Sequence, residues 1–517
     1  MTSSVLDPDV RQGPGRGRRG GAPVRRGLLA TAFVLVALLG AFVAFWHLGR
    51  QTPHTDEFTY TGAGWQYVHG LFTANLEHPP TAKYLFGAAE LVLGVGVPAA
   101  RLVAALASFA TGLVLFVWLR RPIGPWGALL AAGWWWLTPR SDSPTWADVA
   151  SGAAARIDRL ALLEPVMTCF AVAAVAVAWH AATRGGPGER RWWTGTGWWA
   201  LSGVLLALSV TSKVSTAVVV LAIVTLPALF RRWRAYATGG AAAVLGFAVV
   251  FVAVYLPVGG LRAIDYMLAF QSAHDTDGHE ITLLGQRYEL APWWANFVRV
   301  VDGVGWPTVA VLVVGIVAAL VVRPDRLVAV LAIALGSLVV FYCTSNVSLP
   351  HYYQAWMPWA IALAATGVVR TARLRPPGTT VVAVVLVAVT LLPAAVLVRT
   401  VAESRVTGFP RLAPALAAEG VPAGDRILVA GAAQASFLTF TGNRAAPAEL
   451  PHGDFGVVVE ATDSRFPMNP AVQRLLVDEP QRFRTFRVDF LRVWVVRGDA
   501  LLHAEGDTAT LVTPSGP

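Results

Sequence analysis

Long apolar segments alternate with short basic segments from residue 27 to residue 398. Most apolar segments approach the ~20 residues that a helix needs to cross a bilayer. They are rich in Ala, Val and Leu and show no polar–apolar alternation, so a transmembrane β-barrel is not expected. The pattern predicts about eleven membrane-spanning helices. Their ranges are 27–48, 101–118, 124–138, 160–182, 196–212, 213–230, 236–257, 304–322, 327–345, 352–369 and 379–398.

The basic clusters between these segments set the orientation. Lys and Arg collect on the cytoplasmic side of membrane proteins, so we place Arg120-Arg121 and the other arginine clusters there. Residues 1–26 are rich in Arg, Gly and Pro and should form a disordered, basic cytoplasmic tail. Counting the segment 83–97 as a crossing would move Arg120-Arg121 outside. We therefore expect an interfacial or re-entrant helix at 83–97.

Residues 399–517 differ in kind from the rest of the chain. Short apolar or alternating runs at 426–430, 455–459 and 492–496 are separated by Gly, Pro and Asn, as in small α/β domains. The topology puts this segment outside. The predicted fold class is thus an all-α polytopic membrane protein with a small extracytoplasmic α/β domain, divided at 1–26, 27–398 and 399–517.

Composition narrows the class further. Only 14% of the 517 residues are charged, against about 25% in soluble domains. The net charge of +10 comes from arginines between apolar runs, so it indicates membrane orientation and not nucleic-acid binding. The two cysteines, Cys169 and Cys343, fall within predicted spans and support neither a disulfide framework nor a metal site. The high Ala, Val and Arg content is typical of a GC-rich bacterial genome, so we expect a multi-pass protein of a bacterial plasma membrane.

Polar residues outside the spans, or at their outer ends, all fall on one side of the membrane in this topology. Charges at membrane depth usually pair with one another or line a cavity, so a single site is expected. The candidates are Asp56, Glu57, Glu77, His78, Lys83, Arg156, Arg159, Glu164, Lys213, His274, Asp275, Asp277, His279, Glu280, Trp293, Trp294, His351, Tyr352 and Tyr353. Each candidate also has an interpretation in which it only stabilises the fold. For Glu164, this is an ion pair with Arg156 or Arg159. The spacing of the 274–280 residues fits no specific zinc or calcium loop.

The order of these residues resembles that of a known family. The chain resembles GT-C glycosyltransferases of the protein O-mannosyltransferase and aminoarabinose-transferase type, which use polyprenyl-phosphate sugars. The resembling motifs are Asp56-Glu57, Glu77-His78-Pro79-Pro80 with Lys83-Tyr84, Arg156 to Glu164-Pro165, Ser212-Lys213, Gly278-His279 through Gly285, Pro292-Trp293-Trp294 and Pro350-His351-Tyr352. Glu164 departs from the family pattern, in which an Asp is usual at that position.

The resemblance implies a mechanism. Asp56 would be the general base that takes the proton of an acceptor hydroxyl, and attack on the anomeric carbon would invert it. Glu57 and Glu164 would orient sugar hydroxyls or cations. Cations for the lipid-phosphate leaving group would come from Lys213, Arg156, Arg159, His78 and His351. Stacking on the sugar or the prenyl chain would come from Trp293, Trp294, Tyr352 and Tyr353.

The resemblance also bears on cofactors and partners. No cofactor is required, although related oligosaccharyltransferases use a divalent metal, for which the acidic pair would supply ligands. The expected partners are a polyprenyl-phosphate sugar, a protein, lipid or polysaccharide acceptor, and the bilayer, without nucleic acid. The sugar and the acceptor are not identified by the sequence. A transporter or lipid-linked-sugar flippase is the alternative, although such proteins keep their charges near the midplane. A non-enzymatic scaffold would leave the outer cluster unexplained.

Overall fold

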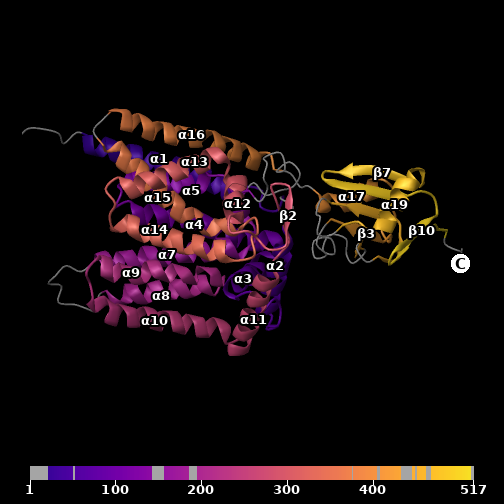
Figure 1. The fold of residues 1–517 in the computed structure, drawn as a ribbon, viewed down its shortest axis with the longest axis horizontal. Coiled ribbons are helices and arrows are strands. Elements are labelled where there is room, and N and C mark those ends of the chain that lie inside the picture. The colour runs from indigo at the N-terminus through magenta and orange to yellow at the C-terminus, as the bar shows by residue number, and fades with distance from the viewer. Residues whose placement is uncertain are drawn as a thin grey trace, which may run out of the picture.

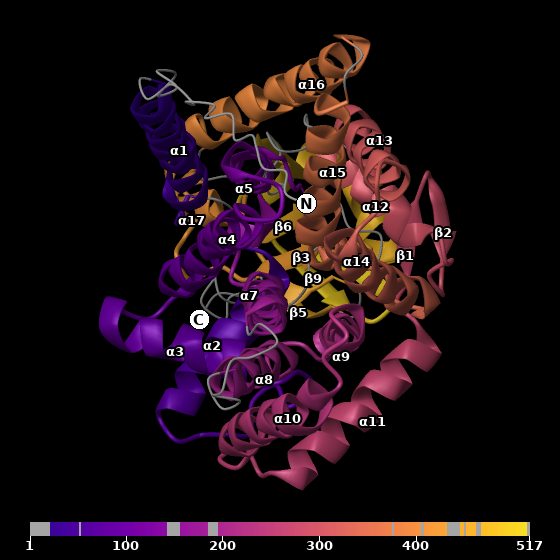
Figure 2. The same ribbon diagram turned by 90° about the vertical axis from the view of Figure 1, so that its left-hand side faces the viewer.

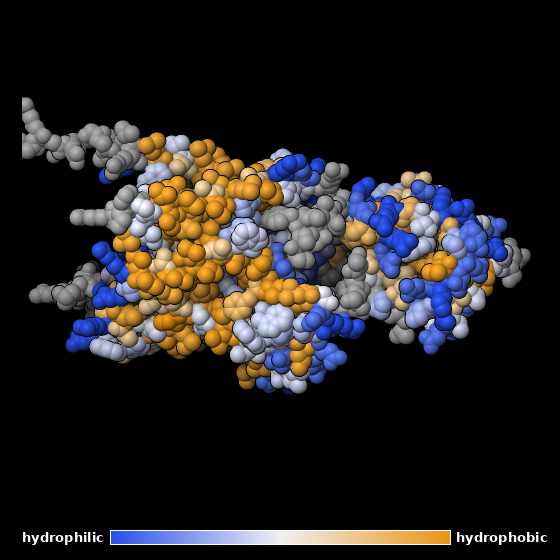
Figure 3. Space-filling view, turned by 45° about the horizontal axis from the view of Figure 1, so that its top comes forward, coloured by the Kyte–Doolittle hydropathy of each residue, from blue (hydrophilic) through white to orange (hydrophobic). Residues whose placement is uncertain are grey.

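The computed structural model describes residues 21–50, 53–141, 156–184, 195–374, 377–404, 408–431, 445–448, 451–461 and 467–513. It consists of a bundle of long helices and a smaller β-rich part formed by the C-terminal residues (Figure 1). The β-rich part lies beyond one end of the bundle, and α16 leads to it from the opposite end (Figure 1). The bundle surface is largely apolar, whereas the β-rich part is largely polar (Figure 3).

A helix lies at every range predicted to span the membrane. These helices are α1 (Gly21–Phe45), α4 (Val97–Leu119), α5 (Pro125–Leu137), α7 (Leu163–Thr183), α8 (Thr196–Val210), η3 (Val214–Val219) with α9 (Val220–Leu229), α10 (Arg234–Tyr255), α13 (Trp306–Val321), α14 (Arg326–Thr344), α15 (Met357–Ala372) and α16 (Pro377–Ala402). In the described part of the chain, 6 helices are long and apolar enough to cross a membrane, or 7 if the bent pair α12–α13 is one span. The larger number of crossings stays a prediction.

Small residues let several helices of the bundle approach closely. A Cβ atom on Gly203 of α8 would lie 1.9 Å from the carbonyl oxygen of Ala243 in α10. A Cβ atom on Gly367 of α15 would lie equally close to the carbonyl oxygen of Gly315 in α13. Helix backbones in a bilayer associate largely through such contacts, because lipid gives apolar side chains little reason to leave it. These glycines therefore fix where the helix pairs cross.

Four further helices and a hairpin cover the end of the bundle that faces the β-rich part (Figures 1 and 2). They are α2 (Thr55–Val68), α3 (Thr81–Leu93), α11 (Leu261–Asp277), α12 (Ala295–Val304) and the hairpin of β1 (Ile281–Leu283) and β2 (Gln286–Tyr288). The α3 helix corresponds to the interfacial helix expected at 83–97. It ends where Gly94 and Gly96 adopt positive φ angles of 95° and 131°. Residue Val97 then starts α4, four residues before the predicted span at 101–118.

The β-rich part contains two sheets. The larger has the strand order β4-β3-β6-β8-β7, with β3 parallel to β4 and β6. The smaller is antiparallel, in the order β10-β9-β5. The elements are α17 (Phe409–Ala418), β3 (Ile427–Ala430), β4 (Ala445–Pro447), β5 (His452–Phe455), β6 (Val457–Glu460), α19 (Pro470–Asp478), η5 (Pro480–Arg482), β7 (Phe483–Val488), β8 (Leu491–Val496), β9 (Leu501–Glu505) and β10 (Thr508–Val512).

The mixture of helices and strands expected after residue 398 is therefore present. The three predicted runs coincide with β3, with the end of β5 and most of β6, and with β8. One face of the larger sheet packs Val429, Val459 and Val493 with Leu412 of α17. The opposite face packs with the smaller sheet, through residues such as Trp494 and Leu502. The domain boundaries proposed from the sequence stay a prediction.

Candidate functional site

The first turn of α2 presents the acidic pair. His54 is the N-cap, and its Nδ1 accepts a hydrogen bond from the backbone N–H of Asp56 at 3.2 Å. The Glu57 carboxylate accepts from the backbone N–H of His54 at 2.8 Å, which completes a capping box. The Asp56 side chain is 32% exposed. The first turn of α2 thus places the Asp56 carboxylate at this end of the bundle, next to the free N–H groups of the helix.

Glu57 is completely buried and paired with Arg101 of α4. Its two oxygens accept from Arg101 Nε at 2.7 Å and Nη2 at 2.6 Å, and Oε1 also accepts from the backbone N–H of Ala161 at 2.7 Å. Arg101 donates a further bond to the carbonyl of Leu48 at 2.6 Å. Of the two roles expected for Glu57, orienting sugar hydroxyls or orienting cations, this geometry fits the second, with Arg101 as the cation. Glu57 fixes the start of α2 against α4 and the segment before α7.

A second buried pair lies next to Asp56. Lys213, in the connection between α8 and η3, forms an ion pair and a hydrogen bond with Glu164 in the first turn of α7. The Lys213 ammonium lies 4.2 Å from the centre of the Tyr352 ring, which belongs to η4 (Tyr352–Ala355). His351 Nε2 is 3.4 Å from Glu164 Oε1. The partner expected for Glu164 was Arg156 or Arg159, and that expectation is wrong, because Lys213 takes the place.

Asp56 completes this group together with two histidines. The Asp56 carboxylate is 3.7 Å from His54 Nδ1, and the rings of His54 and His351 meet edge-on with centres 5.6 Å apart. One donor atom from each of His54, Asp56 and His351 lies within 4.8 Å of the others. Imidazole nitrogen and carboxylate oxygen suit zinc and similar divalent ions. These three residues are thus the ones that could hold a metal at this site.

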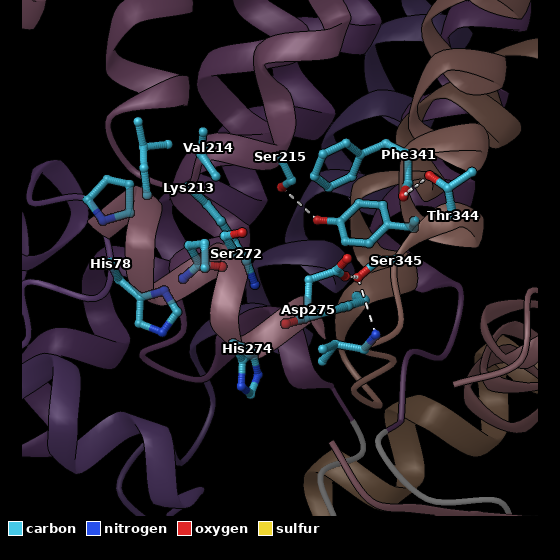
Figure 4. A pocket seen from close by; sticks show the side chains of 16 residues that line it. His78, Lys213, Val214, Ser215, Ser272, His274, Asp275, Phe341, Thr344 and Ser345 are labelled. Atoms are coloured by element: carbon cyan, nitrogen blue, oxygen red, sulfur yellow. Dashed lines mark hydrogen bonds between the residues drawn. The ribbon is translucent and has the colours of Figure 1, made fainter. Parts of the chain in front are cut away.

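A cavity of about 370 Å³ opens beside the group (Figure 4). His78 enters it from the α2–α3 connection, Lys213 from the α8–η3 connection and His274 from α11 (Figure 4). Its lining consists of His78, Pro79, Lys213, Val214, Ser215, Leu268, Gln271, Ser272, His274, Asp275, Phe341, Tyr342, Thr344, Ser345, Val347 and Tyr352. Lys213 is the only lysine or arginine among these lining residues. The lining therefore combines apolar and hydroxyl-bearing residues with one cation, Lys213, and one carboxylate, Asp275.

Two histidines of the site, His78 and His351, are buried in a way that favours their neutral form. Burial lowers the pKa of His78 to about 3, and the positive charges of Lys213 and Lys83 act in the same direction. Burial also lowers the pKa of His351 well below its usual range, and Lys213 and His54 add to the effect while Asp56 opposes it. Neutral imidazoles donate and accept hydrogen bonds, so His78 and His351 are not the cations expected from the sequence.

Two of the expected cations, Arg156 and Arg159, do not line the cavity, and neither does Lys83, which was expected to bind substrate. Lys83 is fully buried in α3 and donates to the carbonyl oxygens of Asn75 and His78, so it shapes the α2–α3 connection. Arg156 is buried in an ion pair with Asp158 and donates to the carbonyl of Trp136. Arg159 donates to the carbonyls of Val43 and Trp46 at the end of α1. Each has a role in holding backbone segments together.

The other expected residues lie around the rim. The Glu77 carboxylate accepts from Tyr266 at 3.2 Å, and its carbonyl accepts from Gln271, so it ties the α2–α3 connection to α11. Asp275 lines the cavity and accepts from Ser345 Oγ at 2.7 Å (Figure 4). His279 lies beside the ring of His274 at 5.7 Å, outside the lining. Trp293 is 68% exposed and contacts Phe297.

Several residues of this region escaped the sequence analysis. Arg101 lies at the edge of an apolar run, where a charged residue is costly and requires a partner, and that cost was the available signal. Arg140, Arg156 and Ser108 all bind the Asp158 carboxylate in a buried network of ion pairs and hydrogen bonds. No sequence motif predicts this network. Tyr342 bonds Ser215 at 2.7 Å across the cavity wall (Figure 4). Tyr342 lies near the end of the largely apolar helix α14, and no sequence motif marks it.

Comparison with known proteins concerns the fold. No protein-family model matches the chain, and no curated protein matches it. Among solved structures, apo ArnT from Cupriavidus metallidurans matches with a TM-score of 0.58 and 15% identity, over 91% of this chain and 98% of that one. The same protein bound to undecaprenyl phosphate matches with a TM-score of 0.55 and 14% identity, over 92% and 98% of the two chains.

A second protein matches more weakly. The oligosaccharyltransferase AglB from Archaeoglobus fulgidus, in complex with an inhibitory peptide and a dolichol-phosphate, has a TM-score of 0.51 and 10% identity. The match covers 84% of this chain and 70% of that one. At such identities the likeness shows the fold alone. The chain thus shares the fold of ArnT and of AglB, in agreement with the fold that its sequence resemblance implied.

Proposed function

We propose that this protein transfers a sugar from a polyprenyl-phosphate donor to an extracytoplasmic hydroxyl group with inversion. The observation that carries the proposal is the placement of a partly exposed carboxylate, Asp56, beside the Lys213–Glu164 pair and a 370 Å³ cavity. The fold neighbours support it, since ArnT binds undecaprenyl phosphate and AglB binds a dolichol-phosphate.

Asp56 acts as the general base. It takes the proton of the acceptor hydroxyl while that oxygen attacks the anomeric carbon from the face opposite the phosphate. General-base help of this kind is commonly worth about 10²–10⁴ in rate. The Glu57–Arg101 pair holds the first turn of α2 against α4 and so keeps the neighbouring Asp56 carboxylate in place. Holding the base in a fixed position matters, because a misplacement of about 1 Å can cost about 10²-fold in rate.

Lys213 stabilises the leaving group. When the bond between the anomeric carbon and the phosphate oxygen breaks, its electron pair leaves with the lipid phosphate, which gains one negative charge. Lys213 is the one lysine or arginine among the described residues that line the cavity. A fixed cation at the position where charge develops is usually a large electrostatic contribution to catalysis. Glu164 and Tyr352 hold the ammonium in place from two sides.

The two neutral histidines act as hydrogen-bonding groups. His78 lines the cavity beside Lys213, and His351 lies between Glu164 and His54. A neutral imidazole can donate one hydrogen bond to a phosphate oxygen or a sugar hydroxyl without adding a permanent charge. His78 therefore contributes to donor binding, while His351 supports the positions of Glu164 and Asp56.

The topology in the membrane follows the sequence. The apolar helices cross the membrane about eleven times, with the N-terminal tail in the cytoplasm and the β-rich part outside. The opposite placement of the β-rich part and of the start of α1 supports this arrangement (Figure 1). Asp56 then lies near headgroup level on the outer side, where a polyprenyl phosphate presents its sugar. The β-rich part stands on the same side and is available to the acceptor.

The decisive experiment compares Asp56→Asn with Asp277→Asn, an exposed acid on the same side that does not line the cavity. Each purified variant is added to membranes of a strain lacking this protein, which supply the acceptor. The donor is radiolabelled polyprenyl-phosphate mannose, arabinose or aminoarabinose. Asp56→Asn should abolish the release of polyprenyl phosphate while donor binding persists, and Asp277→Asn should behave as wild type. Wild-type turnover in Asp56→Asn would remove Asp56 from the role. Donor movement across the bilayer without release of lipid phosphate would instead identify a flippase.

A further inference from the structure

Four potential metal ligands occupy one face of two neighbouring strands in the β-rich part. In the pairing of β5 with β9, His452 lies opposite Glu505 and Asp454 lies opposite His503. Alternate residues of a strand share a face, so all four side chains point the same way. The intervening residues Phe455, Leu502 and Ala504 are buried in the core. The four polar side chains consequently lie on the solvent face, with exposed fractions between 41% and 83%.

The geometry around His503 is that of a prepared metal ligand. Its Nδ1 lies 2.7 Å from Asp454 Oδ1, and a carboxylate can only accept, so Nδ1 carries the proton. The lone pair is then on Nε2, which lies 3.8 Å from Glu505 Oε2. Metal-binding histidines nearly always donate their other N–H to a carboxylate or a carbonyl in this way, because the bond fixes the tautomer and the ring.

Glu505 stands between the two imidazoles, at distances that suit neighbouring ligands of one ion. His452 Nδ1 lies 3.5 Å from Glu505 Oε1, too far for a hydrogen bond and close to the spacing of neighbouring zinc ligands. With zinc–ligand bonds of about 2.0–2.2 Å, tetrahedral ligand atoms are roughly 3.4 Å apart. His452 and His503 are not among the described groups whose donor atoms already converge within 4.8 Å. The His452 side chain is 83% exposed, so it can turn to meet the ion.

We propose that His452, His503 and Glu505 bind a divalent transition-metal ion, zinc in the first place, with Asp454 as the carboxylate that orients His503. Two imidazoles and one carboxylate are a ligand set that zinc accepts, with water in the fourth position. The ion would join β5, an edge strand of the smaller sheet, to β9. This site is separate from the group of His54, Asp56 and His351, and it does not depend on the proposed transfer reaction.

The competing interpretation is a set of surface ion pairs. Exposed pairs of this kind contribute little to stability and require no metal. The two interpretations differ in what Asp454 does. In the ion-pair interpretation Asp454→Asn has no effect on zinc. In the metal site it weakens zinc binding by about 10–100-fold, the usual effect of losing the carboxylate that orients a ligand histidine.

The test is a zinc titration by calorimetry on the full chain in detergent. Wild type should bind one more equivalent of zinc than His452→Ala/His503→Ala, while His69→Ala, which removes another exposed histidine, should match wild type. His54→Ala/His351→Ala removes the other candidate group and should leave this equivalent intact. Asp454→Asn should keep the stoichiometry with a Kd raised about 10–100-fold.

Two outcomes would overturn the proposal. One is equal zinc stoichiometry and Kd in wild type and in His452→Ala/His503→Ala. The other is an absence of zinc binding by wild type at 1 mM, which is roughly the weakest Kd of interest. If the double variant does not fold, Glu505→Gln takes its place, since it removes one ligand and leaves both imidazoles. The thermal unfolding midpoint should rise with added zinc in wild type and should not respond to zinc in Glu505→Gln.

Discussion

Removing Arg101 should destabilise the protein far more than its position in an apolar run suggests. The Glu57 carboxylate accepts hydrogen bonds from Arg101 Nε and Nη2 and from the backbone N–H groups of Ala161 and His54. Arg101→Met would leave that carboxylate buried with only the two backbone donors. Breaking one partner of a buried pair commonly costs about 3–5 kcal/mol, because the remaining charge cannot return to water. We expect a loss of this size in the free energy of unfolding.

The same change should also slow transfer. Asp56 directly precedes Glu57, so a shift of Glu57 toward solvent would move the base. The expected loss in kcat is about 10²-fold for a displacement of about 1 Å. The double variant Arg101→Met/Glu57→Gln carries no buried charge at this position. Its stability should recover toward wild type, because replacing both members of a buried pair is often neutral.

Unfolding in mixed detergent micelles, with wild type, both single variants and the double variant, measures the coupling between the two residues. The structure predicts a coupling of at least about 2 kcal/mol for this bidentate, fully buried pair. A coupling below about 0.5 kcal/mol would refute the reasoning, since residues that do not interact are additive to about that level. Ser337→Ala, a substitution in α14 at a partly buried hydroxyl, is the matched control and should be additive with Arg101→Met.

Three further results are expected. Lys213→Met should lower kcat by about 10²–10³-fold, as for the loss of a preorganised electrostatic donor. Lys213→Arg, which keeps the positive charge, should retain more activity. Equal kcat in Lys213→Met and wild type would exclude Lys213 as the group that stabilises the leaving phosphate. Since the pKa of His78 is lowered to about 3, the unfolded chain takes up a proton at this residue below about pH 6.5 and the folded one does not. Stability should therefore fall as the pH drops from about 6.5 toward 3, by up to about 1.4 kcal/mol per pH unit, and His78→Gln should flatten this dependence in unfolding curves at pH 5 and 7. EDTA should leave the transfer rate unchanged, and a rate restored only by added metal would assign a divalent ion to His54, Asp56 and His351.

Much of the fold followed from the sequence because a bilayer makes hydrophobicity decisive. Every predicted span coincides with a helix, and the basic clusters gave a topology in which Asp56, Glu164, Lys213 and His351 share one side. These four do meet in the structure. The order of these four residues along the chain and their predicted side of the membrane were enough to predict that they lie close together. The start of α4 was placed at Arg101, four residues after its actual first residue, Val97.

The different roles of the buried basic residues could not be predicted from the sequence. Arg156, Arg159 and Lys83 carry the same charge as Lys213, and the sequence offers no means to tell a cation that binds a ligand from one that binds carbonyl groups. The difference arises from which backbone ends lie within reach of each side chain, such as the carbonyls of Trp136 and Val43. Those distances depend on helix packing and loop paths. For the same reason the neutral state of His78 became evident only once its burial was known.

The contact between α2 and α3 has a consequence for how substrate preference can change. A Cβ atom on Gly87 would lie 2.0 Å from the carbonyl oxygen of Gly64, so the two helices touch through bare backbone. Asp56 lies in the first turn of α2 and His78 precedes α3, so the proposed base and one cavity wall belong to a single rigid piece. Any change in that wall would also displace the base. Under the proposed function, variation toward other sugars should therefore fall mainly on lining residues of other elements, such as Ser272 of α11 and Thr344 of α14.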